Sequence, residues 1–202
     1  MATLGDLKTF IASNMVRDDL AVDLADHFLA HINAAIRHYS GRNWWFLAKV
    51  ATTPTVASQN YITRPTTVER IRMVSIPSLG YELDKVDITE IESLDEPTAQ
   101  TGQPTAYAEY GSQLRLWPTP NAVFTVKIVG TEKLTALADD ADENAWTNEG
   151  FDLIAARSEM TLCGFMRDAS GVASAALSVR DAENALNEIN TTRLDGPVCA
   201  AW

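Results

Sequence analysis

The chain has 202 residues, of which 46% are hydrophobic and 21% charged, so it can bury a full core in one domain or two small ones. It carries 16 Lys and Arg against 27 Asp and Glu, and its net charge of -11 makes the average surface repel nucleic-acid phosphates and anionic membranes. No apolar stretch approaches the roughly 18 residues of a membrane span, and the start lacks the pattern of a signal peptide. We therefore expect a soluble, non-secreted protein that has no membrane partner and does not grip DNA.

The N-terminal region predicts two helices. Thr3 can cap a short first helix, and a longer one begins after Met15. Along the second helix, apolar residues recur every four positions: Leu20, Leu24, Phe28, Ile32 and Ile36. This stripe predicts a buried face on an amphipathic helix about five turns long. The helix should end at Gly41, where a left-handed cap has no steric cost.

The centre of the chain predicts short strands, because β-branched and aromatic residues dominate runs that Pro, Asn, Ser or Gly interrupt. Gly111 and Ser112 suit a two-residue hairpin turn. Residues 87–94 are expected to form one or two helical turns, and residues 96–104 a loop. The expected strands are residues 45–56, 61–63, 68–76, 81–86, 106–110, 113–117 and 123–130.

Helical periodicity returns in residues 151–167 and again from Ala173 to about Thr192, joined by a short linker with Gly171 as the helix stop. Helices at both ends and strands in the centre predict an α+β fold, a helical bundle from N- and C-terminal segments with an inserted antiparallel β module. The expected domains are a discontinuous bundle (residues 1–43 and 145–192), the β module with its connecting loops (44–144) and a C-terminal arm (193–202).

A series of landmarks spans residues 5–190. A helix ends in an Arg and aromatic cluster, a Gly-Gln-Pro-x-x-Tyr segment follows, a strand ends in Leu-x-Leu-x-Pro-x-Pro, and an acidic stretch leads to a Trp and a long helix. In this chain they are Arg42, Trp44, Trp45 and Phe46; Gly102, Gln103, Pro104 and Tyr107; Leu114, Leu116, Pro118 and Pro120; and Asp139, Asp140, Asp142, Glu143 and Trp146. Their order and spacing resemble the bacteriophage head-to-tail adaptors, in the long form of podoviruses and related siphoviruses. One departure is Gly130, where an aromatic residue is expected at the end of the alternating strand.

The resemblance implies a structural virion protein of the head-tail neck, assembled in the host cytoplasm. Its expected partners are the portal protein, the tail proteins of the nozzle or tail tube, and copies of itself in a ring of about twelve. DNA is expected to pass through this ring without specific binding, which the acidic composition favours.

All three histidines lie on the second predicted helix, where His27, His31 and His38 share one flank. His27 and His31 are one turn apart and could hold a metal, but no Glu follows His27 and His38 is too far along the axis to join them. We expect a polar or subunit-contact flank, with a pH-sensitive interface or a metal site as alternatives.

Two further clusters have ordinary interpretations. The acidic run from Asp139 to Glu143 lacks the alternating ligands and central Gly of a calcium-binding EF-hand loop, so we expect solvated charge ahead of the helix near Trp146. The Trp44-Trp45-Phe46 cluster has no interleaved basic residues, which favours a plug between the helices and the β module over a stacking platform for sugars or bases.

Enzyme motifs are missing from the sequence: it has no G-x-S-x-G, P-loop or dinucleotide fingerprint. Cys163 and Cys199 are too few for a disulfide framework or zinc site, and we expect reduced thiols, no catalysis and no cofactor. Two alternatives stay open. A cell-wall glycan hydrolase would need a carboxylic acid of raised pKa in a cleft, and a free-standing protein- or sugar-binding module would need an exposed aromatic platform.

The C-terminal residues have an unusual makeup, because Gly196 and Pro197 end any helix and an apolar end follows. We expect an arm whose side chains, Leu194, Val198 and Trp202, bind the portal or a neighbouring subunit, together with the histidine flank. The alternative is that the tail folds back onto its own subunit.

Overall fold

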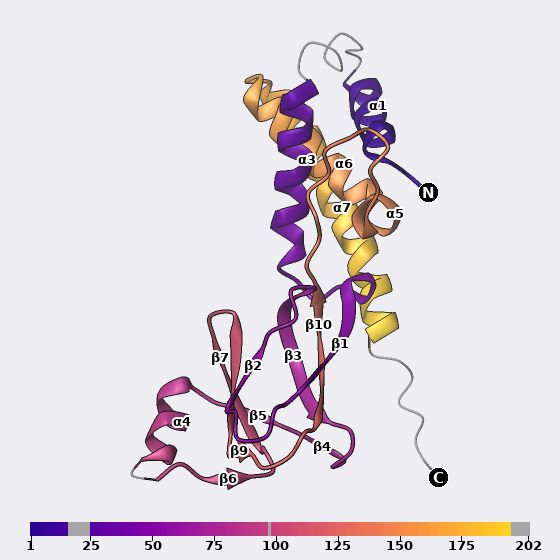
Figure 1. Ribbon diagram of the computed structural model, residues 1–202. Helices are drawn as coiled ribbons and strands as arrows, with labels where there is room; N and C mark the ends of the chain where they lie inside the picture. Colours follow the sequence, from indigo (N-terminus) through magenta and orange to yellow (C-terminus); the bar gives the residue numbers. More distant parts are fainter. Residues whose placement is uncertain (16–24, 97, 195–202) are drawn as a thin grey trace, which may run out of the picture. The chain divides into compact units, whose positions relative to one another are not determined.

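Figure 1 shows the computed structural model, which describes residues 1–15, 25–96 and 98–194. The chain has a mixed α+β fold, as the sequence predicts, with six α-helices and mostly antiparallel sheets in the described ranges. It divides into two compact units, one made of Met1–Leu47 and Leu134–Trp202, the other of Ala48–Lys133. Among the described helices, none is long and apolar enough to cross a membrane.

The first unit, here the helical unit, is built around α6, which packs against α1, α3 and α7. Phe28 and Ile32 of α3 share one buried cluster with Leu153 and Ile154 of α6, which confirms the predicted stripe for the described part of that helix. Leu20 and Leu24 lie outside the described residues. The helices are α1 (Leu4–Asn14), α3 (Ala25–Ser40), α5 (Ala145–Glu149), α6 (Phe151–Phe165) and α7 (Ala169–Leu194), with a 3-10 helix, η1 (Trp45–Leu47), after α3.

An aromatic cluster of Trp44, Phe46 and Trp146 joins the two sequence segments of the helical unit. The ring of Trp146 lies 5.5 Å from that of Trp44 and 4.9 Å from that of Phe46, both in edge-to-face geometry. The indole of Trp44 donates to the Tyr39 carbonyl and that of Trp146 to the Ser40 hydroxyl, so both buried N–H groups are satisfied. The cluster predicted to be a plug therefore packs within the helical unit.

The second unit, here the β unit, contains two four-stranded sheets, a pair of short parallel strands and α4 (Ile88–Asp95). The first sheet has the order β1 (Ala48–Pro54), β10 (Thr125–Glu132), β3 (Val68–Ile76), β4 (Tyr81–Glu82). The second has the order β2 (Tyr61–Thr63), β8 (Gln113–Trp117), β7 (Ala106–Tyr110), β5 (Asp84–Lys85), and the pair is β6 (Thr101–Gly102) with β9 (Thr119–Pro120). The facing sides of the two sheets share a single core cluster.

The β unit begins with β1 and ends with β10, and these strands pair antiparallel with Ala48 opposite Thr131. The two connections to the rest of the chain therefore leave from adjacent strand ends (Figure 1). Pairing across 83 residues of sequence is set by the core-facing residues, since Val126 and Ile128 of β10 are fully buried.

Glycine conformation accounts for two features of the β unit. Gly111 has φ of +57° at the turn between β7 and β8, as the predicted hairpin requires. At Gly130, where the β10–β3 register shifts, an added Cβ would lie 2.0 Å from the Arg70 carbonyl oxygen. The aromatic residue that the resemblance implies at this position has no room.

Two predicted helix ends are wrong in detail. α3 does end at Ser40, but Gly41 is not in the left-handed region, where the described glycines are Gly80 and Gly111. α7 begins at Ala169 rather than Ala173, so Gly171 lies inside its first turn and is no helix stop. The carboxylate of Asp168 accepts from the N–H groups of Ser170 and Gly171, and this cap starts the helix early.

Truncation of the α3 stripe tests the helical core. Phe28→Ala and Ile32→Ala should each lower the free energy of unfolding by about 2–5 kcal/mol, because both side chains are buried and would leave cavities. Chemical denaturation measures the change, with Ala34→Ser on the exposed face of α3 as control. Stability within about 0.5 kcal/mol of the parent would show that the stripe does not pack as described.

Gly130→Ala tests the close approach of β10 to β3. The new methyl group would press on the Arg70 carbonyl and on Val68, so we expect a loss of about 1–3 kcal/mol in unfolding free energy. Gly41→Ala is the matched control, because an added Cβ there meets nothing within 4 Å. Equal melting temperatures for Gly130→Ala and the parent would contradict the observed strand spacing.

Candidate interaction surfaces

The three histidines lie along α3, and two of them, His27 and His31, contact the same ring, Phe165 of α6. His27 is exposed and stacks on Phe165 of α6 at 4.7 Å between ring centroids, whereas His38 lies edge-on to Tyr39 at 4.8 Å. His31 Nδ1 lies 2.9 Å from the Thr161 hydroxyl. His27 and His31 thus lie against α6, and within the described residues no group of three His, Cys, Asp or Glu could hold a metal.

His31 is the half-buried member of the histidine flank. Thr161 donates its hydroxyl proton to the Ser158 carbonyl, so His31 Nδ1 must be the donor in its own contact with Thr161. Burial, and then the nearby His27, lower the pKa of His31 below its ordinary 6.5. The neutral ring is therefore the form that the folded helical unit favours.

The acidic run caps α1 rather than preceding only α5. The carbonyl oxygens of Asp142 and Asp140 accept from the N–H groups of Leu4 and Gly5 in the first turn of α1, and Lys8 pairs with the Asp140 carboxylate at 2.6 Å. Bonds from the N–H groups of Asp139 and Ala138 lower the pKa of Asp142. Asp139, Asp140 and Glu143 are exposed ahead of α5, as expected, but the N-cap of α5 itself is Asn144.

The described residues include only the first two positions of the predicted C-terminal arm, residues 193 and 194. α7 continues through Leu194, whose side chain is exposed. Val198 and Trp202 lie outside the described residues, and their partners stay a prediction.

Sequence reasoning missed an acidic groove formed by α1, α6 and α7. Two neighbouring hollows of about 500 and 180 Å³ share Asn14 and Glu159 in their walls, and the two together are called the acidic groove. Its α7 wall consists of small residues, Gly171, Ser174, Ser178 and Ala182. It is further lined by Phe10, Met15, Met166, Asp152 and Asp168, and none of the described lining residues is Lys or Arg.

Cys163 lies in the wall of this groove as a free thiol. Burial, and then the charges of Glu159 and Asp168, raise the pKa of Cys163. Because the thiolate is the nucleophilic form, the groove has the opposite electrostatics from a catalytic cysteine site.

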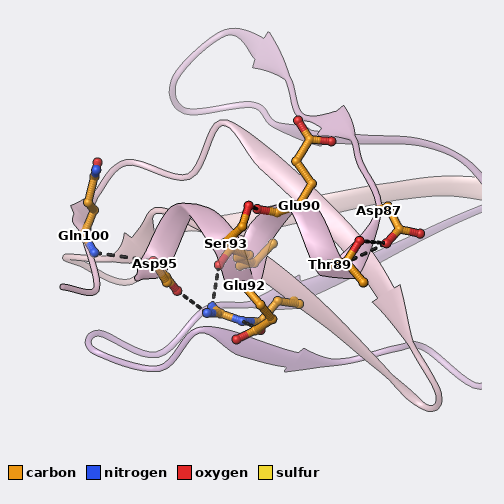
Figure 2. Close-up of polar contacts among 9 residues, drawn as sticks. Asp87, Thr89, Glu90, Glu92, Ser93, Asp95 and Gln100 are labelled. Carbon is orange, nitrogen blue, oxygen red and sulfur yellow. Dashed lines mark hydrogen bonds and ion pairs between the residues drawn. The ribbon is translucent and has the colours of Figure 1, made fainter. Parts of the chain in front are cut away.

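In the β unit, a buried arginine anchors α4. Arg115 of β8 donates to the carboxylates of Glu92 at 2.9 Å and of Asp95, both on α4, and its guanidinium lies 5.1 Å from the Tyr61 ring. Burial by itself would lower the pKa of Arg115, but the bonds to Glu92 and Asp95 outweigh it and raise the pKa. Figure 2 shows both acids on α4 with the helix capped by Asp87, whose carboxylate accepts from the Thr89 N–H at 2.9 Å. This cluster holds α4 to the sheet.

The helical unit thus presents a groove and a histidine flank, and in the β unit the pairs of Arg115 with Glu92 and Asp95 fix α4 on the sheet. The model of the SU10 adaptor protein family matches residues 2–200 of the chain. The chain belongs to the SU10 adaptor family. This is a family of phage head-to-tail adaptors, so the predicted resemblance is confirmed and this adaptor is a structural virion protein. A comparison with curated protein sequences found no match.

Titration of His31 should be visible in the stability of the adaptor. The folded state lowers the pKa of His31 below 6.5, so the unfolded chain binds the proton more tightly and the melting temperature should fall as the pH drops below 6.5. The fall should level off below the folded-state pKa. His31→Gln should flatten the profile between about pH 7 and 5, measured by thermal unfolding. His38→Gln is the control for loss of an exposed histidine, and an equal change of slope in both variants would contradict the assignment.

Proposed function

We propose that this chain is a ring-forming subunit of the virion neck, which links the portal to the tail nozzle or tail tube and lets DNA pass. The observation that carries the proposal is the family match, because it extends over both the helical and the β unit. Assembly in the host cytoplasm and a ring of about twelve copies, to match the portal, are parts of the same proposal.

In this role we infer a helical bundle with an inserted β module, which the division into a helical unit and a β unit supports. The adjacent ends of β1 and β10 allow the module to leave and rejoin the bundle at one place. We infer that the helical unit, the β unit and a C-terminal arm (193–202) act as separate parts, since a neck subunit must contact the portal, the tail and its own neighbours.

The charge distribution supports passage of DNA. The helical unit has 8 Lys and Arg against 17 Asp and Glu, whereas the β unit has 8 against 10. Most of the net charge of -11 therefore belongs to the helical unit. If part of this charge lines the bore, the phosphates of moving DNA meet repulsion instead of adhesive contacts.

Depletion of the chain during infection tests the proposed function. We expect DNA-filled heads that lack tails, because the portal would have no seat for the tail, and images of complete particles should place the chain between portal and tail. A chain carrying Ala34→Ser, exposed on α3, should restore tailed particles and serves as the control. Normal tails on depleted particles, or a chain located elsewhere in the virion, would refute the role.

Truncation after Arg193 tests the arm. We expect an unchanged melting temperature for the isolated chain but impaired attachment to the portal, because a buried terminal Trp anchors a partner without stabilising its own subunit. Co-sedimentation with portals measures attachment, and Trp202→Ala in the full chain should reproduce much of the loss. A drop of several degrees in the isolated chain would mean that the tail belongs to its own core.

A further inference from the structure

We propose that neighbouring copies join through two unlike faces: an exposed face of the β unit, here the strand face, and the acidic groove of the next copy's helical unit. The strand face comprises Val50, Met73 and Val129 with the cation Lys127, and Arg72 is exposed beside it at the β3–β10 register shift. The inference rests on the proposed ring, and names the surfaces that would close it.

The strand face lies on the side of the first sheet that is turned away from the β-unit core. Val50 of β1, Val129 of β10 and Met73 of β3 are directly opposite one another, and thus share a face across three strands. Their sequence neighbours Ile128 and Val74 are fully buried on the other face. Val50 is 55% exposed and α4 packs on the second sheet, so no described helix of the β unit covers this row.

Cations border this apolar row. Lys127 precedes Val129 on the same face of β10, opposite Thr52 and Ser75. Arg72 is exposed where the β3–β10 register shifts. No carboxylate of the described residues pairs with Arg72 or Lys127, although other surface cations of the unit, such as Lys49 and Lys85, have acidic partners. The face therefore offers apolar contact beside positive charge that no carboxylate of the described residues pairs with.

The acidic groove has the complementary makeup. Phe10, 40% exposed, stands at its rim and contacts Phe151 edge-on at 5.3 Å, while Asp152 and Glu159 contribute negative charge. No described Lys or Arg lines the groove to neutralise these acids. Apolar and negative groups together fit the apolar and positive strand face.

A second copy of this chain is the occupant that these observations favour. Both faces belong to every copy, so each subunit can offer its strand face to one neighbour and its groove to the other, as a closed ring requires. DNA is a poorer occupant, because its phosphates gain nothing from the row of three apolar side chains on the strand face.

Photo-crosslinking tests which faces meet. The full chain with a benzophenone amino acid at position 50 is mixed with a heavy-isotope chain and irradiated at about 1 mM. The probe should form crosslinks between light and heavy copies in peptides of α1, α6 or α7. The same probe at position 34, on the exposed side of α3, is the control and should not label these helices selectively. Crosslinks only within one copy, crosslinks that map elsewhere, or a chain that stays monomeric would each overturn the interface.

Charge reversal supplies a test that a merely structural role cannot imitate. Lys127→Glu and Glu159→Lys should each weaken self-association about tenfold or more by placing like charges together. A mixture of the two variants should assemble again, because the new carboxylate on the strand face of one copy then meets the new ammonium group in the groove of the next. Sedimentation velocity measures assembly, and Arg180→Glu, an exposed charge reversal on α7, should leave it unchanged.

The controls separate this interface from the ring itself. If Lys127→Glu proves unfolded by its melting curve, the exposed Arg72→Glu replaces it in the same mixture. Failure of the mixture to assemble overturns the interface. Rings of the parent that form through other residues would leave the proposed neck function standing, whereas depleted phages with normal tails would refute the neck function whatever faces the copies use.

Discussion

The structure depends first on the aromatic cluster of Trp44, Phe46 and Trp146. These residues are about a hundred positions apart in sequence and bracket the β unit, so their contact closes a long loop whose entropic cost burial must offset. Both indole N–H groups have acceptors, so the cluster has a specific geometry that apolar contact alone would not impose. α3, η1 and α5 meet at this cluster. The position of α6 follows, because Gly150 lies beside the Trp146 ring and leads directly into α6.

Much of the fold could be predicted because local chemistry decides it. The strands at residues 61–63, 68–76, 106–110 and 113–117 have the predicted bounds, since alternating β-branched and aromatic runs end at turn residues there. The four-residue stripe of α3 similarly indicates its buried face. The start of α7 was missed because Asp168 captures two N–H groups through its side chain, and a Gly in a first turn looks the same in sequence as a Gly that ends a helix.

The interaction surfaces were much less predictable, because they are made by residues that only tertiary structure brings together. The acidic groove combines α1 with residues of α6 and α7 more than 140 positions away, and no local pattern marks Phe10 or Glu159 as neighbours. The Arg115 anchor is also non-local, though less so, with its acids 20 and 23 positions away on a separate helix. The histidine flank was visible from helical spacing, but the contact with Thr161 that distinguishes His31 was not.

The adjacent ends of the β unit have a mechanical consequence. Tension that pulls residue 47 away from residue 134 would load the β1–β10 ladder at one end. The Ala48–Thr131 pair would be strained first, and each following pair only after the one before it has opened. Such a ladder unzips at low force, whereas a ladder pulled along its strands resists with all its hydrogen bonds at once. Trp44 and Trp146 flank the β unit in sequence, so a load applied from outside them is carried by their contact before it reaches the sheet.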